Sequence, residues 1–316
     1  MKYVVLSAGQ EWNDYCWEGV VSNNDRVLYI NNLFPKFLER LWRRKLFRTP
    51  FLLKVLWYPV IKRMLKISQI TTTLIVYDWS LITFSLMIVE MLKKEYCNLN
   101  IVYVFTNFVK VSGAKTYGLL EKLKDYYDAV FAFDPADSVK LGFEYSRLVY
   151  EPNASRLSSD VIEYDLFYVG QAKDRYPKLI EIFKNATSQS LRCKFFITGI
   201  SQENRYIHPD IIYNSPLSYS EVLTYINKSH CLVDAVQGDS TGMTIKTSEA
   251  IFWNKKLITT NECITKEKYY KPSNICVYKD KCDLKRFLEL EFLPYTDEDK
   301  YEFSSTSLFN QIKKLL

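Results

Sequence analysis

Residues 238–249, GDSTGMTIKTSE, place two glycines, several hydroxyl side chains and one carboxylate around the predicted start of a helix. Ser240, Thr241 and Thr244 supply the hydroxyls. The first turn of a helix adds backbone N–H groups without intrahelical partners and the positive end of the helix dipole, which together favour phosphate. The same residue types also serve as ordinary helix caps. The stretch therefore predicts either a phosphate site or a plain cap.

Two cations occupy a similar position earlier in the chain. Lys173 and Arg175 directly follow the strand-like run YDLFYVG and precede a helical pattern. Arginine can donate two parallel hydrogen bonds to neighbouring oxygens, and lysine adds a compact positive charge, so the pair suits a diphosphate. The alternative is that both cations are solvated in a loop.

Glu249 is a carboxylate inside the apolar run EAIFW. Burying a carboxylate without a partner is costly, and the two hydroxyls of a ribose are suitable partners. Glu249 is thus a candidate ribose ligand, and the alternative is that it faces solvent.

Three motifs for nucleotide and metal chemistry are absent from the sequence. It contains no GxxxxGK[ST], GxGxxG or HExxH pattern, which argues against simple NTPases and dinucleotide enzymes. The seven cysteines form no CxxC pair and only two histidines occur, which argues against structural zinc and favours reduced thiols. We expect no cofactor and no metal.

The elements that must position these residues alternate between strand-like and helix-like patterns, which is typical of βαβ units with parallel sheets. The predicted strands cover 2–8, 26–32, 71–79, 99–107, 129–134, 147–152, 164–170, 193–199, 210–216, 231–237 and 255–260. The predicted helices cover 81–96, 116–127, 135–143, 176–186, 218–229, 244–254 and a capped C-terminal segment, 305–316.

A chain of 316 residues exceeds the size at which one core usually suffices, so two domains are expected. The polar stretch 153–160 reads as a linker between residues 1–152 and 161–316. We therefore predict an α/β protein with two Rossmann-like domains in tandem. The four glycines of the second half, Gly170, Gly199, Gly238 and Gly242, all fall at the carboxyl ends of predicted strands or the starts of helices, where open parallel sheets bind ligands.

A basic insertion at 34–66 dominates the charge of the first domain. The net charge of the whole chain is only +6, yet this insertion contains ten Lys and Arg residues. Apolar and cationic residues repeat there at helical spacing on nearly opposite faces, as in helices that lie on membrane surfaces. The patch residues are Lys36, Arg40, Trp42, Arg43, Arg44 and Arg48. The alternative is a helix that packs on the core with its cations solvated. A third interpretation, nucleic-acid binding, has no RNA- or DNA-binding motif to support it.

The segment 217–261 resembles the donor-binding region of GT-B glycosyltransferases. It has that family's order of helix, strand, small-residue loop, helix with Glu-Ala and following strand. The segments FYVGQAKDRYPKLIEIF and CKFFITG resemble the family's diphosphate loop and next strand. The resemblance is strongest to bacterial enzymes of surface-polysaccharide assembly. It covers about 100 residues of the second domain. The first domain resembles the family only in its alternation of strands and helices.

By position, the resemblance implies a nucleotide-sugar site in the second domain. Glu249 would hold the ribose, and Lys173 and Arg175 the diphosphate. Backbone N–H groups near the phosphate and the sugar would come from Gly242, Met243 and Thr244. The base would be bordered by Gly199, Ser215 and Pro216.

One position departs from the family. Many retaining members have a glutamate where this chain has Thr241, so the stereochemical outcome is left open. An inverting enzyme needs a general base near the acceptor. Because both histidines lie in the second half, the candidates are Glu11, Asp14 and Asp78.

We therefore expect a metal-independent glycosyltransferase with a nucleotide-sugar donor and a lipid-linked saccharide acceptor. No signal peptide or full-length membrane span is predicted, so we expect a cytoplasmic protein that is peripheral at the anionic inner face of the plasma membrane. The alternatives are a sugar-nucleotide epimerase on the same fold and a non-catalytic membrane-associated assembly protein.

Overall fold

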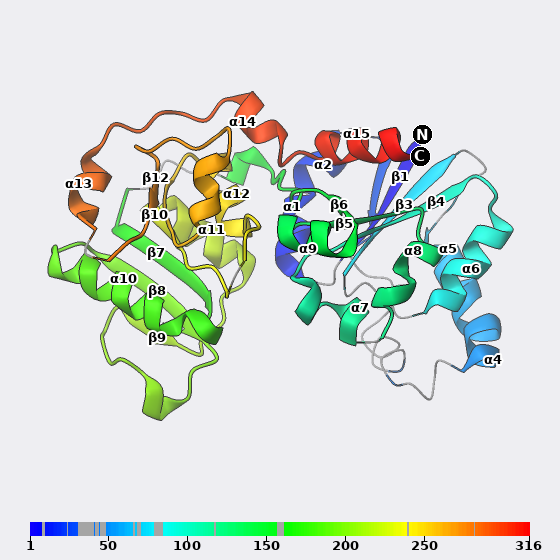
Figure 1. Cartoon of the computed structure of the whole chain (residues 1–316), viewed down its shortest axis with the longest axis horizontal. Helices are drawn as coiled ribbons and strands as arrows, with labels where there is room; N and C mark the ends of the chain where they lie inside the picture. The colour runs from blue at the N-terminus through cyan, green and yellow to red at the C-terminus, as the bar shows by residue number, and fades with distance from the viewer. Residues whose placement is uncertain are drawn as a thin grey trace. The chain divides into compact units, whose positions relative to one another are not determined.

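The computed structural model describes residues 1–7, 10–23, 25–30, 41, 44, 49–65, 67, 71–78, 85–116, 118–156, 161–238, 240–280 and 282–316. The chain divides into two compact units. The first comprises Met1–Pro152 together with Ser305–Leu316, and the second comprises Asn153–Ser304. Each contains one six-stranded sheet in which every pair of neighbouring strands is parallel (Figure 1).

The first sheet has the order β2-β1-β3-β4-β5-β6. Its strands are β1 (Lys2–Leu6), β2 (Val27–Ile30), β3 (Thr72–Tyr77), β4 (Leu99–Val104), β5 (Ala129–Ala132) and β6 (Glu144–Tyr145). All six residues of β3 are buried, as expected for a central strand covered on both faces. The expected strand at 147–152 does not form, and the edge strand ends at Tyr145 instead.

Helices connect the strands of the first unit. They are α1 (Glu11–Cys16), α2 (Glu18–Asn23), α4 (Pro50–Leu52), α5 (Tyr58–Leu65), α6 (Leu86–Glu95), α7 (Gly113–Thr116), α8 (Leu123–Tyr126) and α9 (Pro135–Leu141), with a π-helical turn at Leu53–Trp57. The single helix expected at 116–127 is broken into shorter pieces. Gly118 has a φ of +66°, a left-handed conformation that ends a helix.

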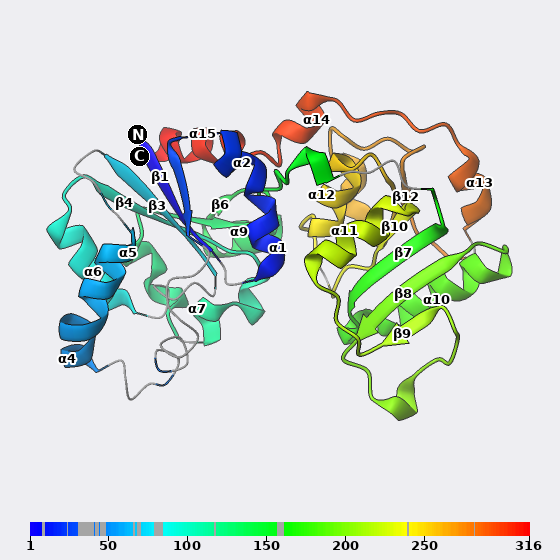
Figure 2. The same ribbon diagram turned by 180° about the vertical axis from the view of Figure 1, so that it is seen from behind.

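The second sheet has the order β12-β11-β10-β7-β8-β9. Its strands are β7 (Tyr164–Gln171), β8 (Cys193–Thr198), β9 (Ile211–Tyr213), β10 (Ser229–Asp234), β11 (Lys256–Thr259) and β12 (Ile275–Val277). The helices are α10 (Tyr176–Ser188), α11 (Tyr219–Asn227), α12 (Ile245–Phe252), α13 (Leu284–Glu289) and α14 (Asp297–Tyr301). Helix α10 covers one face of the sheet, whereas α11 and α12 lie on the other (Figures 1 and 2).

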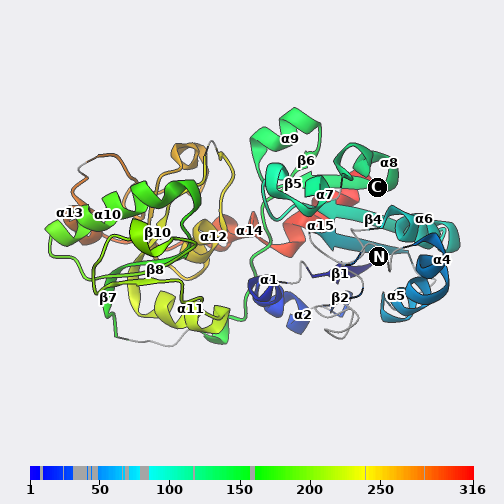
Figure 3. The same cartoon turned by 90° about the horizontal axis from the view of Figure 1, so that it is seen from below.

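The C-terminal helix α15 (Ser305–Leu315) belongs to the first unit, which corrects the expectation that residues 161–316 form one domain. The helix lies beside β1 (Figure 3). The ring of Phe309 stacks on Tyr3 at a centroid distance of 3.9 Å, and the carboxylate of Glu151 accepts a hydrogen bond from the N–H of Ser305. Sequence periodicity predicts the helix, but not the sheet on which it packs.

Candidate functional site

The order of each sheet reverses at one point, and ligands of open parallel sheets bind beyond the carboxyl ends of the strands there. In the second unit this switch point lies between β7 and β10. Lys173 and Arg175 form a 3₁₀ turn directly after β7. The guanidinium of Arg175 donates to the carbonyl of Gln171 at the end of β7 and to that of Ala235 after β10, both at 2.9 Å. Arg175 therefore joins the two strand ends that flank the switch point.

Lys173 extends this cationic edge toward the loop between β10 and α12. Its φ of 47° lies in the left-handed region, and its side chain is exposed. The ammonium donates to the side-chain oxygen of Gln237 at 3.0 Å. The predicted diphosphate cations and the predicted phosphate loop thus lie together at one switch point.

Hydrogen bonds from Asn261 hold the loop that precedes α12. The Asn261 amide donates to the carbonyl of Gly242 at 3.1 Å and to that of Thr241 at 3.5 Å. The side chain of Met243 is buried, so only its backbone could meet a ligand. The hydroxyl of Thr244 caps α12 by accepting from the N–H of Lys246 at 3.1 Å. The N–H of Ser240 donates to the carbonyl of Gln237.

Glu249 is neither solvent-facing nor open to a ligand. It is 0% exposed. One carboxylate oxygen accepts from the hydroxyl of Tyr219 at 2.8 Å, and the other from the ammonium of Lys246 at 2.5 Å. The structure thus shows a buried ion pair in place of solvent exposure. The ribose contact stays a prediction, and it would require this pair to open.

Asp234 is a carboxylate at the same switch point that the sequence reasoning missed. It ends β10, is buried, and accepts a hydrogen bond from the hydroxyl of Thr259 at 3.4 Å. Burial raises its pKa, and the nearby positive charge of Arg175 opposes that shift. The edge therefore combines cations with a carboxylate whose charge is disfavoured.

The residues predicted to border the base lie on the other side of β7. Gly199 follows β8 with a φ of +81°, and its N–H donates to the side-chain oxygen of Asn214 at 2.9 Å. Ser215 and Pro216 follow β9 and are exposed. They occupy the same edge of the sheet as Lys173 and Arg175, beyond neighbouring strands.

The sequence spacing could have indicated one of the two partners of Glu249, namely Lys246. Lys246 precedes Glu249 by three residues, a spacing that places two side chains on one face of a helix. Tyr219 gave no such signal, because it comes from α11 and meets Glu249 only through the packing of α11 against α12.

The switch point of the first sheet lies between β1 and β3, and the described residues there include the carboxylates of Asp14 and Asp78. Asp14, on α1, accepts hydrogen bonds from Ser7 at 3.0 Å and from Tyr29 at 2.8 Å. Its side chain is half-buried, and burial raises its pKa despite the two hydrogen bonds, which lower it. A partly accessible carboxylate with a raised pKa has the properties of a general base.

The other two candidate bases differ from Asp14 in exposure. Glu11 is exposed at the start of α1. Asp78 follows β3, is fully buried, and accepts from the hydroxyl of Tyr103 at 2.7 Å. Of the three, Asp14 combines access with a perturbed pKa.

Most of the predicted membrane patch lies outside the described residues, namely Lys36, Arg40, Trp42, Arg43 and Arg48. Arg44 is described and exposed. The segment that follows exposes Phe51 (71%), Val55 (59%) and Leu56 (44%). The opposite side of this segment packs into the first core through Leu53, Trp57 and Ile61.

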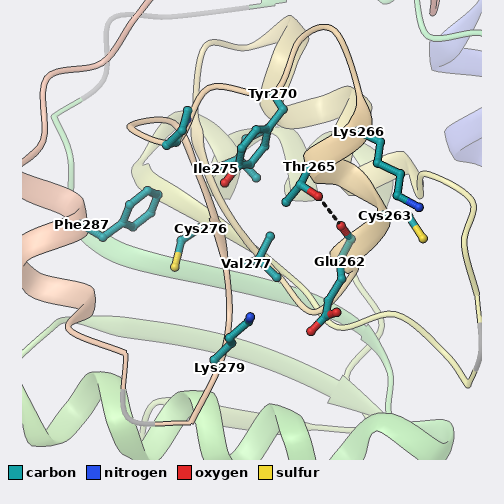
Figure 4. Close-up of a pocket in the computed structure, with 11 residues that line it drawn as sticks. Glu262, Cys263, Thr265, Lys266, Tyr270, Ile275, Cys276, Val277, Lys279 and Phe287 are labelled. Carbon is teal, nitrogen blue, oxygen red and sulfur yellow. Dashed lines mark hydrogen bonds between the residues drawn. The ribbon is translucent and has the colours of Figure 1, made fainter.

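An open cavity of about 630 Å³ lies at the outer edge of the second sheet, beside β12 and the 3₁₀ helix Glu262–Lys266 (Figure 4). Its wall includes Ile275, Val277 and Phe287, and Lys279 points into it. None of the residues predicted to bind a donor lines it. We therefore place the candidate donor site at the β7/β10 switch point and not in this cavity.

The described part of the chain lacks two further features. No three His, Cys, Asp or Glu side chains gather there as a metal-ligand set. No helix there is long and apolar enough to cross a membrane. Independence from metals stays a prediction.

No family profile matches the chain, and no curated protein matches it in sequence. Solved structures do match its fold. HepE from Anabaena, in complex with UDP and glucose, has a TM-score of 0.55 at 10% identity and covers 99% of this chain and 98% of that chain. UDP-N-acetylglucosamine 2-epimerase from Rickettsia bellii has a TM-score of 0.48 at 11% identity and covers 99% of this chain and 96% of that chain. The glycotransferase of kitacinnamycin has a TM-score of 0.47 at 9% identity and covers 100% of this chain and 98% of that chain.

At such low identity the likeness defines the fold. Two six-stranded parallel sheets with flanking helices match the GT-B glycosyltransferase fold, and the predicted fold class is confirmed.

Proposed function

We propose that the protein is a metal-independent glycosyltransferase that moves a sugar from a nucleotide-sugar donor to a saccharide acceptor. The observation that carries this proposal is the convergence of Lys173, Arg175 and the start of α12 at the β7/β10 switch point. The similarity of fold to HepE, which was solved with UDP and glucose, supports the same donor class.

The second unit would stabilise the leaving group. As the bond between the sugar and the phosphate breaks, negative charge accumulates on the nucleoside diphosphate. Lys173, Arg175 and the N–H groups of α12 are already in place and need little rearrangement, and such preorganised charge is usually a large contribution to catalysis. Gly242 and Thr244 would contribute through their backbone, because hydrogen bonds to Asn261 and Lys246 hold this loop.

The first unit would supply the base for an inverting transfer. Asp14 takes the proton of the acceptor hydroxyl, the acceptor oxygen forms the new bond to the sugar carbon, and the diphosphate departs with the electron pair of the broken bond. Hydrogen bonds from Ser7 and Tyr29 hold the Asp14 carboxylate in one orientation.

The acceptor would be lipid-linked, in surface-polysaccharide assembly at the cytoplasmic face of the plasma membrane. Support comes from the cations of the basic insertion and from the exposed apolar side chains Phe51, Val55 and Leu56 within it. Aromatic and aliphatic side chains next to cations are the elements of an interfacial membrane anchor. Each cation near anionic lipid contributes on the order of 1 kcal/mol.

Vesicle sedimentation tests the membrane part of the proposal. Phe51→Asp and charge reversal at Arg44 should each weaken binding to vesicles that contain anionic lipid. Val139→Asp is the matched control, because Val139 is an exposed apolar residue of the first unit outside this region (85% exposed). Equal binding by all variants would refute the anchor.

A thermal-shift screen with UDP, GDP, CMP and their sugars tests the donor part. We expect one nucleotide to raise the melting temperature, and its sugar conjugate to release that nucleotide when an acceptor is present. Interconversion of the donor sugar without release would indicate an epimerase. No shift with any nucleotide would favour a non-catalytic assembly protein.

A further inference from the structure

The buried ion pair of α12 leaves the cation, and not the carboxylate, at the surface of the candidate donor site. Glu249 is 0% exposed, whereas the side chain of Lys246 retains 12% of its surface. Both oxygens of Glu249 accept hydrogen bonds from the protein, one from Tyr219 and one from Lys246. A ribose that bound Glu249 directly would have to displace a charged partner at 2.5 Å.

Lys246 occupies a position that local helix energetics disfavour. It is the second residue of α12, where the dipole and the unpaired N–H groups repel a cation. Aspartate, glutamate or an uncharged residue would stabilise this helix start better. Residues that break a local rule in this way are frequently those that bind a ligand. Here an anion at the start of α12 would remove the conflict.

The surroundings of Lys246 indicate the chemistry of that anion. Lys246 and Arg175 both act electrostatically on the buried Asp234 at the end of β10, and they belong to different elements, Lys246 to α12 and Arg175 to the turn after β7. Lys173 reaches the same loop through Gln237. Cations from different elements at one switch point suit an extended, doubly charged group such as a diphosphate better than a neutral sugar.

We propose that Lys246 is a donor-binding cation that contacts the diphosphate, and that Glu249 is a positioning residue that acts through it. This inference rests on the proposed function of the second unit. Four rotatable bonds make a free lysine side chain mobile. The carboxylate of Glu249 fixes the ammonium, and Tyr219, from the neighbouring helix α11, fixes the carboxylate. Such preorganisation lowers the entropic cost of binding.

Lys256 shows what a purely structural lysine looks like in the same unit. Its ammonium donates to the carbonyls of Phe287 and Leu290 at 2.7 and 2.6 Å, at the end of α13, and its side chain is 1% exposed. Both partners are internal carbonyls. Lys246, by contrast, has one charged partner among the described residues, Glu249, and it lies at the edge where the ligand is expected.

Calorimetric titration of the intact chain tests the proposal, with UDP, GDP, ADP and TDP as probes and the matching nucleosides beside them. For the diphosphate that binds, Lys246→Met should raise Kd about 10- to 100-fold, as expected for loss of a charge-assisted contact. Lys246→Arg should retain most of the affinity. Nucleoside affinity should change less than about 2-fold in both variants, because the base and ribose contacts remain. The salt dependence of diphosphate binding should also weaken in Lys246→Met, a change that a purely structural role would not cause.

Glu249→Gln should have the same effect as Lys246→Met: it should raise the Kd for the diphosphate and leave the Kd for the nucleoside unchanged. The double variant Lys246→Met/Glu249→Gln removes both charges, so it should melt close to the wild type and still bind the diphosphate weakly. Lys271→Met is the matched control, because Lys271 forms a partly buried pair with Asp299 at 2.7 Å in the same unit. It should leave every Kd unchanged.

Two results would overturn the inference in different ways. If Glu249→Gln raises the Kd for the nucleoside and the Kd for the diphosphate by the same factor, Glu249 binds the ribose and does not act through Lys246. If the wild type binds a diphosphate and Lys246→Met binds it equally well, Lys246 makes no contact. Failure of the wild type to bind any probe would instead refute the proposed function on which the inference rests.

Discussion

Each of the two sheets has one switch point, and the described residues at the two switch points differ in charge. In the second sheet, Lys173 and Arg175 follow β7, and Lys246 lies near the start of α12, the helix that follows β10. In the first, the corresponding edge contains Asp14 and Asp78 with hydroxyl partners. The parallel sheet explains why polar residues gather at both edges, since each edge is formed by loops and helix starts. Under the proposed function, this difference in charge would place the anionic donor on the second unit and the base on the first.

Substitution of Asp14 is expected to have the largest effect. Asp14→Asn should lower kcat about 10²- to 10⁴-fold, the usual contribution of a general base, and leave donor affinity unchanged. Steady-state kinetics together with nucleotide titration measure both. Glu11→Gln is the control, because Glu11 is an exposed residue of the same helix. A large loss in Glu11→Gln with full activity in Asp14→Asn would reverse the assignment.

Substitution of Glu249 tests the chemistry of the second edge through stability. Glu249→Ala leaves the ammonium of Lys246 mostly buried without its carboxylate, which should cost about 3–5 kcal/mol in the free energy of unfolding. Chemical denaturation measures this loss. Asp299→Ala, in the more exposed pair with Lys271, should cost less. A Glu249→Ala variant as stable as the wild type would contradict the buried pair.

A pair of glycines compares how tightly the two units are packed. A Cβ on Gly19 would lie 2.7 Å from the backbone carbonyl oxygen of Glu151, which cannot move aside. A Cβ on Gly170 would lie 2.8 Å from the hydroxyl of Tyr168, which is a side-chain atom and not a backbone atom. Gly19→Ala should therefore lose about 1–3 kcal/mol of stability, and Gly170→Ala less. Thermal melts measure both losses. A smaller loss in Gly19→Ala than in Gly170→Ala would show that the backbone at Glu151 moves to accommodate the added Cβ.

The smallest expected effect concerns pH. Burial raises the pKa of Asp14 above its ordinary value of 3.8, and the base is active only when deprotonated. The acid side of the kcat/KM profile should therefore have its midpoint above that of an exposed aspartate. In the window between the ordinary and the raised pKa, the folded state binds more protons than the unfolded state, so stability falls as pH rises through it. Asp14→Asn should remove this slope, and a slope that persists would assign it to another group.

The sequence by itself determined the fold class, because strand-length apolar runs that alternate with helices can be buried only as parallel sheets with helices on their faces. It also determined that Lys173, Arg175 and residues 240–244 lie at one edge, since parallel strands end on the same side. These features depend on local pattern and on topology alone.

Tertiary structure decided the features that depend on distant partners. Helix α15 has the amphipathic pattern of any surface helix, and tertiary contacts such as the stacking of Phe309 on Tyr3 assign it to the first unit. Glu249 seemed from its neighbours to require either solvent or a ligand. It has Tyr219, thirty residues away, as a second internal partner, and that contact exists only because α11 packs against α12. The partners of a buried charge can come from any element that packs against it. Sequence spacing shows only the partner on the same helix, here Lys246, and not Tyr219 from α11.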